Sequence, residues 1–170
     1  PEVQFTVQAE HGQYWRTTSY DRYTGDGWIN AADVSDEEKF RPAEGPTRRV
    51  NQTIQVETSM TTMPAAWRPY DIESEIMEMS EINTGTTLQP ERTLTQGETY
   101  TVSSSVLDSS VSELQTAGTS YPSDIEETYT QFPSDVPDRV QERTGTIVSD
   151  ATTAYDTTLL IEQYLQTSKG

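Results

Sequence analysis

The sequence predicts a mainly β protein of the α+β class, in which an antiparallel, sandwich-like β domain is followed by two or three C-terminal helices. In the N-terminal part of the chain, apolar and polar residues alternate with period two, which is typical of half-buried strands. From Tyr121 onward, prolines separate segments whose apolar residues have helical spacing. We therefore expect a β-rich domain over residues 1–120 and a helical region over residues 121–170.

The clearest strand patterns lie in three places. Near the start, Val3, Phe5 and Val7 alternate with polar residues. Residues 50–56 and 99–107 repeat this alternation over longer stretches. Because successive side chains of a strand point to opposite faces, each of these segments has one face for a core and one for water. We expect them to form the body of the sheet.

A hairpin is predicted between the first strand and residue 50. Residues 13–23 are rich in aromatic residues and threonine and read as a strand, and residues 24–27 contain the Asp-Gly pair that favours a tight turn. Trp28 then starts the return strand. Residues 73–79 and 86–94 are weaker strand candidates, each bounded by turn residues.

Three helices are predicted after Tyr121. The first opens at Pro122 and closes at Pro133, the second runs from Pro137 to Val148, and the third spans residues 153–166. The third has a broad apolar face that needs a partner surface. We expect the residues facing that partner to be Tyr155, Leu159 and Tyr164.

Charge excludes several classes of partner. The chain has 28 acidic and 11 basic residues, which gives a net charge of -17. The electrostatic field of this negative charge repels the phosphates of nucleic acid and the head groups of an anionic membrane. No apolar run reaches the roughly 18 residues of a membrane helix. Both ends of the sequence have the character of fragment boundaries, and we expect membrane attachment only through spans elsewhere in a parent protein.

The same composition indicates a halophilic origin. Only Lys39 and Lys169 are lysines, and the other basic residues are arginines. At molar salt the Debye length falls to about 3 Å, so crowded carboxylates repel each other little. An ordinary acidic protein and a disordered acidic chain are the alternatives, but 3 Trp and 9 Tyr favour a packed core over disorder.

Catalysis by this chain alone is not expected. It has no cysteine, so it has neither a thiolate nucleophile nor a thiolate metal ligand, and His11 is its only histidine. No Gly-x-Ser-x-Gly or phosphate-loop motif occurs. The acid pair Glu37 and Glu38 is adjacent in sequence, which does not define the separation that glycosidase chemistry needs. No cofactor is implied.

Candidate sites remain for binding and modification. Trp15, Tyr20 and Trp28 are candidates for a carbohydrate- or peptide-binding face, although packing between strands is the commoner use of such aromatics. Asn51 begins an N-glycosylation motif. The aspartates Asp21, Asp26 and Asp33 surround a glycine turn but lack the spacing of a calcium loop, so we expect no metal site.

An ordered set of motifs carries a family resemblance. Residues 14–28 read YWRTTSYDRYTGDGW, and residues 97–102 read GETYTV. Residues 121–140 and 155–165 add further landmarks in the same order. The set resembles the β-rich extracytoplasmic region that precedes the catalytic core in membrane-anchored transglutaminase-like proteins of bacteria and archaea, and we identify it with the halophilic archaeal type of these presumed cysteine proteases.

The resemblance implies a parent attached to the cell membrane, with a papain-like core that uses Cys, His and Asp. None of that triad lies in this sequence. The chain is then a structural and interaction module that positions or gates the parent's core, and the helix with Tyr155, Leu159 and Tyr164 faces that core or mediates self-association. The alternative is a ligand-binding β-sandwich that recognises a cell-surface polymer or peptide.

Overall fold

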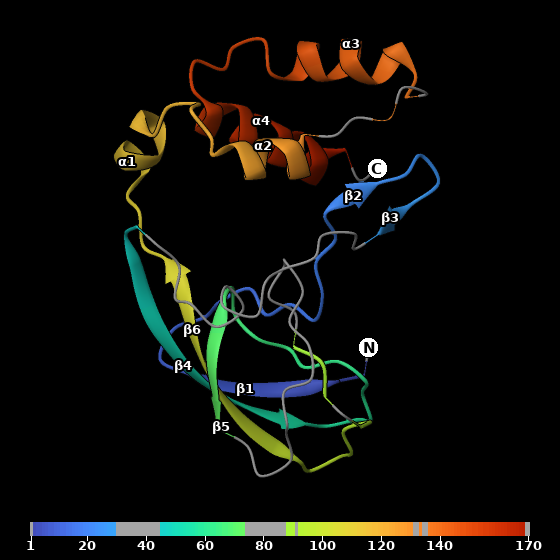
Figure 1. Ribbon diagram of the computed structural model, residues 1–170, viewed down its shortest axis with the longest axis vertical. Helices are drawn as coiled ribbons and strands as arrows, with labels where there is room; N and C mark the ends of the chain where they lie inside the picture. The colour runs from blue at the N-terminus through green and yellow to red at the C-terminus, as the bar shows by residue number, and fades with distance from the viewer. Residues whose placement is uncertain are drawn as a thin grey trace. The chain divides into compact units, whose positions relative to one another are not determined.

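The computed structural model describes residues 2–29, 45–73, 88–90, 92–130, 133 and 136–168 (Figure 1). The chain divides into two compact units. The first unit comprises Pro1–Arg22 and Trp28–Asp108, and the second comprises Tyr23–Gly27 and Ser109–Gly170. The first contains the main sheet and the second contains the helices, so the predicted fold class, antiparallel sheets followed by C-terminal helices, is confirmed.

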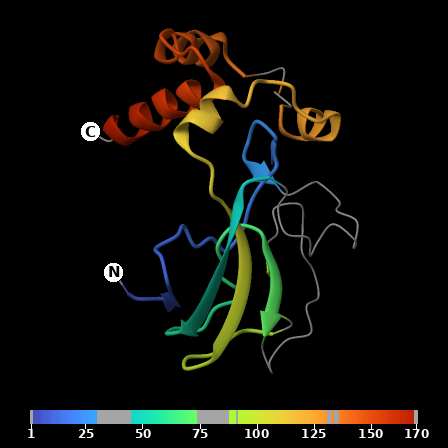
Figure 2. The same ribbon diagram turned by 90° about the vertical axis from the view of Figure 1, so that its left-hand side faces the viewer.

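A four-stranded antiparallel sheet forms the first unit. Its strand order is β1-β4-β6-β5. The long strands β4 and β6 run side by side as curved ribbons, which both views show (Figures 1 and 2). Three of the four strands contain the period-two patterns expected from the sequence. The bounds are Phe5–Ala9 for β1, Thr47–Val56 for β4, Pro69–Glu73 for β5 and Thr99–Leu107 for β6.

The predicted hairpin is present as two short strands, β2 (Arg22–Tyr23) and β3 (Trp28–Ile29). Its turn is closed by the Thr24 backbone N–H, which donates to the carbonyl oxygen of Gly27 at 2.9 Å. The strand predicted over residues 13–23 is wrong, because within this segment the structure forms only an isolated bridge at Arg16 before β2 starts at Arg22. High strand propensity is not enough there, because the described residues place no regular partner strand beside the segment.

The core packs on one face of the sheet. Ile54 and Val102 are fully buried there, next to residues of two bridged segments rather than of long strands. Met63 pairs with Leu88 and Met60 pairs with Leu94 as isolated bridges, so the described positions of the strand predicted for residues 86–94, which are 88–90 and 92–94, form no regular strand. The residues of the main buried cluster are Ile54, Val56, Met63, Ala65, Leu88, Leu94, Tyr100 and Val102.

The start of β6 is fixed by a clamped turn. Gly97 has φ +91°, a left-handed conformation that favours glycine, and its N–H donates to the Val56 carbonyl oxygen at 2.8 Å. Arg92 forms an ion pair with Glu98 at 2.6 Å. The hydrogen bonds that the Glu98 carboxylate accepts from Arg92 and from the Thr95 N–H lower the pKa of Glu98. The turn therefore sets the register of the motif at 97–102.

The described residues of the second unit include four helices, α1 (Val111–Thr116), α2 (Ser123–Tyr129), α3 (Asp138–Ile147) and α4 (Ala154–Thr167). The last three agree with the helices expected after Tyr121. The first was not predicted, although its capping box of Ser110 and Glu113 is visible in the sequence as Ser-x-x-Glu. Within the described residues, no helix is both long and apolar enough to span a membrane.

Some expectations fall on residues that the structure does not describe. They are Asp33, Glu37, Glu38, Phe132, positions 86–87, and positions 74–79 of the weak strand candidate 73–79. The first residue of that candidate, Glu73, is described and ends β5.

Candidate functional site

A buried glutamine joins three parts of the first unit. Gln52 lies on the core face of β4 and is 1% exposed. Its Oε1 atom accepts hydrogen bonds from the Trp15 indole N–H at 2.8 Å and from the Ala66 backbone N–H at 2.9 Å. Its Nε2 atom donates to Ser104 Oγ at 2.8 Å, and that hydroxyl donates to the Ala66 carbonyl oxygen at 3.1 Å. We call these four residues the Gln52 network.

The Gln52 network explains why the segment around Trp15 has a fixed place without being a strand. Arg16 exchanges backbone hydrogen bonds with Ala65 at 3.0 and 3.1 Å, next to the indole contact. The sequence did contain a signal for this network. Gln52 is a polar residue at an inward position of an otherwise mostly apolar strand face, and buried polar groups are almost always hydrogen-bonded.

The three aromatic candidates lie in different environments. Trp15 is half-buried in the Gln52 network, whereas Tyr20 is 57% and Trp28 is 61% exposed. Tyr14, next to Trp15, is 93% exposed. The Trp15 side chain is thus fixed by contacts within the protein, whereas the side chains of Tyr20 and Trp28 are accessible to solvent. A role of these aromatics in binding stays a prediction.

The outward face of the sheet is polar. Arg49 Nε donates to Asn51 Oδ1 at 2.8 Å, and Arg49 Nη2 donates to Ser103 Oγ at 2.8 Å. Ser103 Oγ in turn donates to Asn51 Oδ1 at 3.0 Å. The Arg49 guanidinium lies 6.0 Å from the centre of the Tyr70 ring. Asn51 is exposed at the middle of this face, so glycosylation at Asn51 stays a prediction about an accessible side chain.

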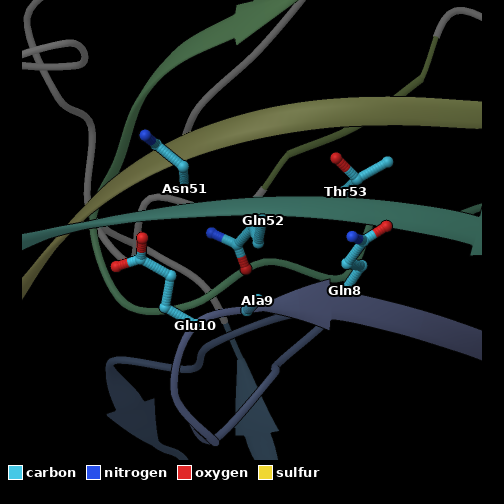
Figure 3. Close-up of a pocket in the computed structure, with 6 residues that line it drawn as sticks. All are labelled: Gln8, Ala9, Glu10, Asn51, Gln52 and Thr53. Carbon is cyan, nitrogen blue, oxygen red and sulfur yellow. The ribbon is translucent and has the colours of Figure 1, made fainter.

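A hollow of about 450 Å³ lies where β1 ends beside β4. Figure 3 shows the residues that line it. Five of the six carry amide, hydroxyl or carboxylate side chains, and the sixth is an alanine. The lining residues are Gln8, Ala9, Glu10, Asn51, Gln52 and Thr53. Nothing in the sequence pattern indicated that these residues share a hollow.

The helical unit has accessible surfaces throughout. Among residues 109–168 whose burial the structure describes, none is buried. On α4, Tyr155 and Tyr164 are half-buried and Leu159 is 37% exposed. Arg143 of α3 lies 5.0 Å from the centre of the Tyr164 ring and donates to its hydroxyl at 3.3 Å. These contacts lower the pKa of Tyr164. Whether the apolar face of α4 meets a core stays a prediction.

The helix ends are held by carboxylates. Glu113 accepts from the Ser110 hydroxyl at 2.7 Å, and Asp156 accepts from the Thr152 hydroxyl at 2.8 Å. These hydrogen bonds lower the pKa of both carboxyl groups. Gln115 Nε2 also donates to Asp156 at 3.3 Å, which links α1 to the start of α4. The carboxylates of Glu113 and Asp156 are therefore engaged in capping, at the starts of α1 and α4.

A metal centre finds no support in the part of the chain that the structure describes. There, no group of three side chains of the types His, Asp or Glu is placed to hold a metal ion. Asp21 and Asp26 belong to the region of the hairpin turn, as the sequence suggested, whereas Asp33 is outside the described residues.

Comparison with known proteins gives the sheet unit a family. The sequence model of the family described as TgpA N-terminal domain matches residues 1–110. Among solved structures, the periplasmic domain of TgpA from Pseudomonas aeruginosa is similar, with a TM-score of 0.58 and 18% sequence identity. Its ethylmercury-bound form gives a TM-score of 0.54, also at 18% identity. No curated protein matches the chain.

The solved structures extend beyond the matched region. The alignment with each covers 97% of this chain but 55% of the solved chain. At this sequence identity, the structural similarity establishes a shared fold. The similar region includes the helical unit, which the family match at residues 1–110 does not cover.

Proposed function

Because the chain belongs to the TgpA N-terminal domain family, we propose that it is a non-catalytic accessory module of a transglutaminase-like protein. We propose further that it positions, or restricts access to, a core that uses Cys, His and Asp. The similar periplasmic domain of TgpA supports an extracytoplasmic location, with attachment to the membrane through other parts of the parent.

The observation that carries this proposal is the contrast between the two units. The sheet unit has a buried core of its own, whereas no residue with described burial in 109–168 is buried. A helical surface without buried side chains contributes little stability by itself, because burial of apolar area is the main driving force of folding. The apolar face of α4 is therefore suited to cover another part of the parent.

The accessory role predicts that the isolated chain has no transglutaminase or protease activity. A thiolate nucleophile is impossible without cysteine, and His11 has no second histidine to support it. We expect incorporation of a fluorescent amine into a glutamine-containing protein at the level of the blank, with an active transglutaminase as the positive control. Incorporation above the blank contradicts the prediction.

Positioning and gating differ in their effect on the parent. If the module positions the core, the double variant Tyr155→Ala/Leu159→Ala in the full-length parent lowers activity and stability together. If it gates the core, the variant raises activity toward a large substrate. The exposed Gln163→Ala on the same helix is the matched control and leaves both unchanged. If the double variant has the same activity and stability as the unaltered parent protein, both roles of α4 are contradicted.

We also propose that the module is adapted to high salt, as its charge of -17 suggests. Ion pairs between side chains join Arg48 to Asp108 and Arg92 to Glu98. Because the chain has 28 acidic and only 11 basic residues, most of its carboxylates depend on solvent and screening ions rather than on a basic partner.

We expect the midpoint of thermal unfolding of the sheet unit to rise by about 5–10 °C between about 0.05 M and about 2 M KCl, since screening weakens repulsion. Tryptophan fluorescence follows the transition. A variant with less charge, Glu2→Gln/Asp71→Asn/Glu73→Gln, should show a smaller rise, because all three side chains are exposed. Equal midpoints at both salt concentrations contradict the adaptation.

A further inference from the structure

The outer side of β1 is open. Within the described residues, the strand order β1-β4-β6-β5 places β4 on one side of β1 and no strand on the other. Figure 2 shows β1, in dark blue, at the margin of the sheet. The open edge of a strand presents unpaired N–H and C=O groups, to which another strand can bind.

The register of β1 on β4 shows which of its backbone groups are unused. In an antiparallel pair of strands, hydrogen-bonded residue pairs alternate with pairs that are not hydrogen-bonded. The Glu57 N–H donates to the Gln4 carbonyl oxygen at 2.9 Å, so the even-numbered residues of β1 are the ones that bond to β4. The N–H and C=O groups of Phe5, Val7 and Ala9 therefore point away from β4. Among the described residues, no hydrogen bond is assigned to these groups.

The usual protection of an edge strand is missing from β1. Edge strands are commonly kept from pairing by charged side chains, by proline or by a bulge. The segment from Val3 to Ala9 contains neither a charged residue nor a proline, although the chain has a net charge of -17. The pairing of β1 with β4 is regular from Phe5 to Ala9, without a shift in register. The edge is therefore suited to pairing.

The open edge is complementary to itself. Phe5, Val7 and Ala9 are evenly spaced about Val7, and each presents one donor and one acceptor. If a second copy lies antiparallel with its Val7 opposite Val7, each of the three residue pairs exchanges two backbone hydrogen bonds. On the core face, the large Phe5 then lies opposite the small Ala9 of the second copy. Phe5 and Val7 are half-buried against the main core cluster, so this pairing extends the apolar face from one copy to the other.

We propose that β1 pairs antiparallel with β1 of a second copy of this chain, so that two sheets join across a two-fold axis. The occupant is a second copy because its edge has the same spacing of donors and acceptors and places an apolar residue opposite each apolar residue. A basic partner is not favoured, since the segment itself has no charge to attract it. The inference goes beyond the accessory role and does not depend on it.

The dimer should be weak and favoured by salt. A pair of five-residue strands is small beside the about 1,200–2,000 Å² that stable interfaces bury, so we expect a dissociation constant of about 0.1–1 mM in about 2 M KCl. Two copies with a charge of -17 each repel one another, and salt screens this repulsion. We therefore expect weaker association in about 0.05 M KCl.

The test is amide hydrogen exchange by NMR on the full 170-residue chain at about 0.02 mM and about 2 mM, in about 2 M KCl. Between these concentrations, the amides of Phe5, Val7 and Ala9 should gain protection by about two- to tenfold, because they are bonded only in the dimer. The amides of Thr6 and Gln8 bond to β4 and should be protected at both concentrations. In a mixture of isotope-labelled and unlabelled chains, nuclear Overhauser effects between the two Val7 residues measure the register.

Two double variants test the register by charge. Thr6 and Gln8 are exposed, and in the proposed dimer Thr6 lies opposite Gln8 of the second copy. Thr6→Lys/Gln8→Lys places like charges opposite each other, whereas Thr6→Lys/Gln8→Glu places opposite charges there. We expect the Lys/Glu variant to dimerise about tenfold more tightly by sedimentation. Repulsion between whole chains predicts the reverse order, because the Lys/Lys variant has the smaller net negative charge.

Three results overturn the proposal. The first is protection of Phe5, Val7 and Ala9 that does not depend on concentration up to about 2 mM. The second is a Lys/Lys variant that dimerises as tightly as the Lys/Glu variant, or more tightly. The third is concentration-dependent protection confined to α4, which would show that a second copy covers the helix and leaves β1 open.

Discussion

Replacement of Gln52 by Met is expected to lower the free energy of unfolding of the sheet unit by about 2–4 kcal/mol. Methionine has a similar shape but offers no comparable acceptor to the Ala66 N–H or the Trp15 indole N–H. A buried group that loses its partner costs about 1–3 kcal/mol, and here two donors are affected. Against a total stability of about 5–15 kcal/mol, the loss is large.

The matched control is Gln55→Met on the same strand. Gln55 is exposed on the outward face, so we expect a change within about 0.5 kcal/mol. Urea unfolding followed by tryptophan fluorescence measures both variants. A third variant, Trp15→Phe, removes the indole donor and should cost less than Gln52→Met, because Ala66 keeps its acceptor. A stability of Gln52→Met equal to that of the parent chain contradicts the structural role of the network.

The sheet could be predicted well where packing follows local pattern. Val50, Ile54 and Val56 alternate with polar neighbours, and this alone determines which face of β4 is buried. Residues 99–107 agree with the bounds of β6. A slip of one residue in β4 would turn Val50, Ile54 and Val56 away from the core, so the register is strongly constrained once the strands are adjacent.

The layer opposite the sheet could not be predicted in the same way. Leu88 and Leu94 are buried through isolated bridges to Met63 and Met60, and such contacts leave no periodic pattern. The strand prediction for residues 13–23 was wrong for a related reason. Its aromatic and threonine content favours strands, but single contacts made by Trp15 and Arg16 hold it.

The candidate sites were predictable in part. The sequence identified Trp15 as important but not its partner, because the two residues are 37 positions apart and their contact depends on how the segment crosses the sheet. The hollow was not predicted at all. Glu10 and Asn51 come together only because β1 ends beside β4, and the end of a strand pairing has no signature in a single sequence.

The α4 backbone is expected to exchange its amide hydrogens far faster than the sheet. Exchange from the centre of β4 requires unfolding of a buried core, which corresponds to protection factors of about 10⁴ or more for a stability of at least about 5 kcal/mol. Exchange from α4 requires only local opening, since no described residue of the helical unit is buried. We expect protection factors below about 10² over residues 154–167 in a monomeric sample.

The capping box at Thr153 and Asp156 does not change this expectation. It holds the first turn, but a cap contributes only about 0.5–2 kcal/mol, and isolated helices of about 12–15 residues are marginal in water. If Tyr155, Leu159 and Tyr164 face the core, joining the chain to the rest of its parent should raise the protection factors of α4 by more than about tenfold. If a second copy of the chain covers these residues instead, dilution should lower the protection factors of α4. Protection of α4 equal to that of β4 in a monomer contradicts both, because the helix would already have its full partner surface within these 170 residues.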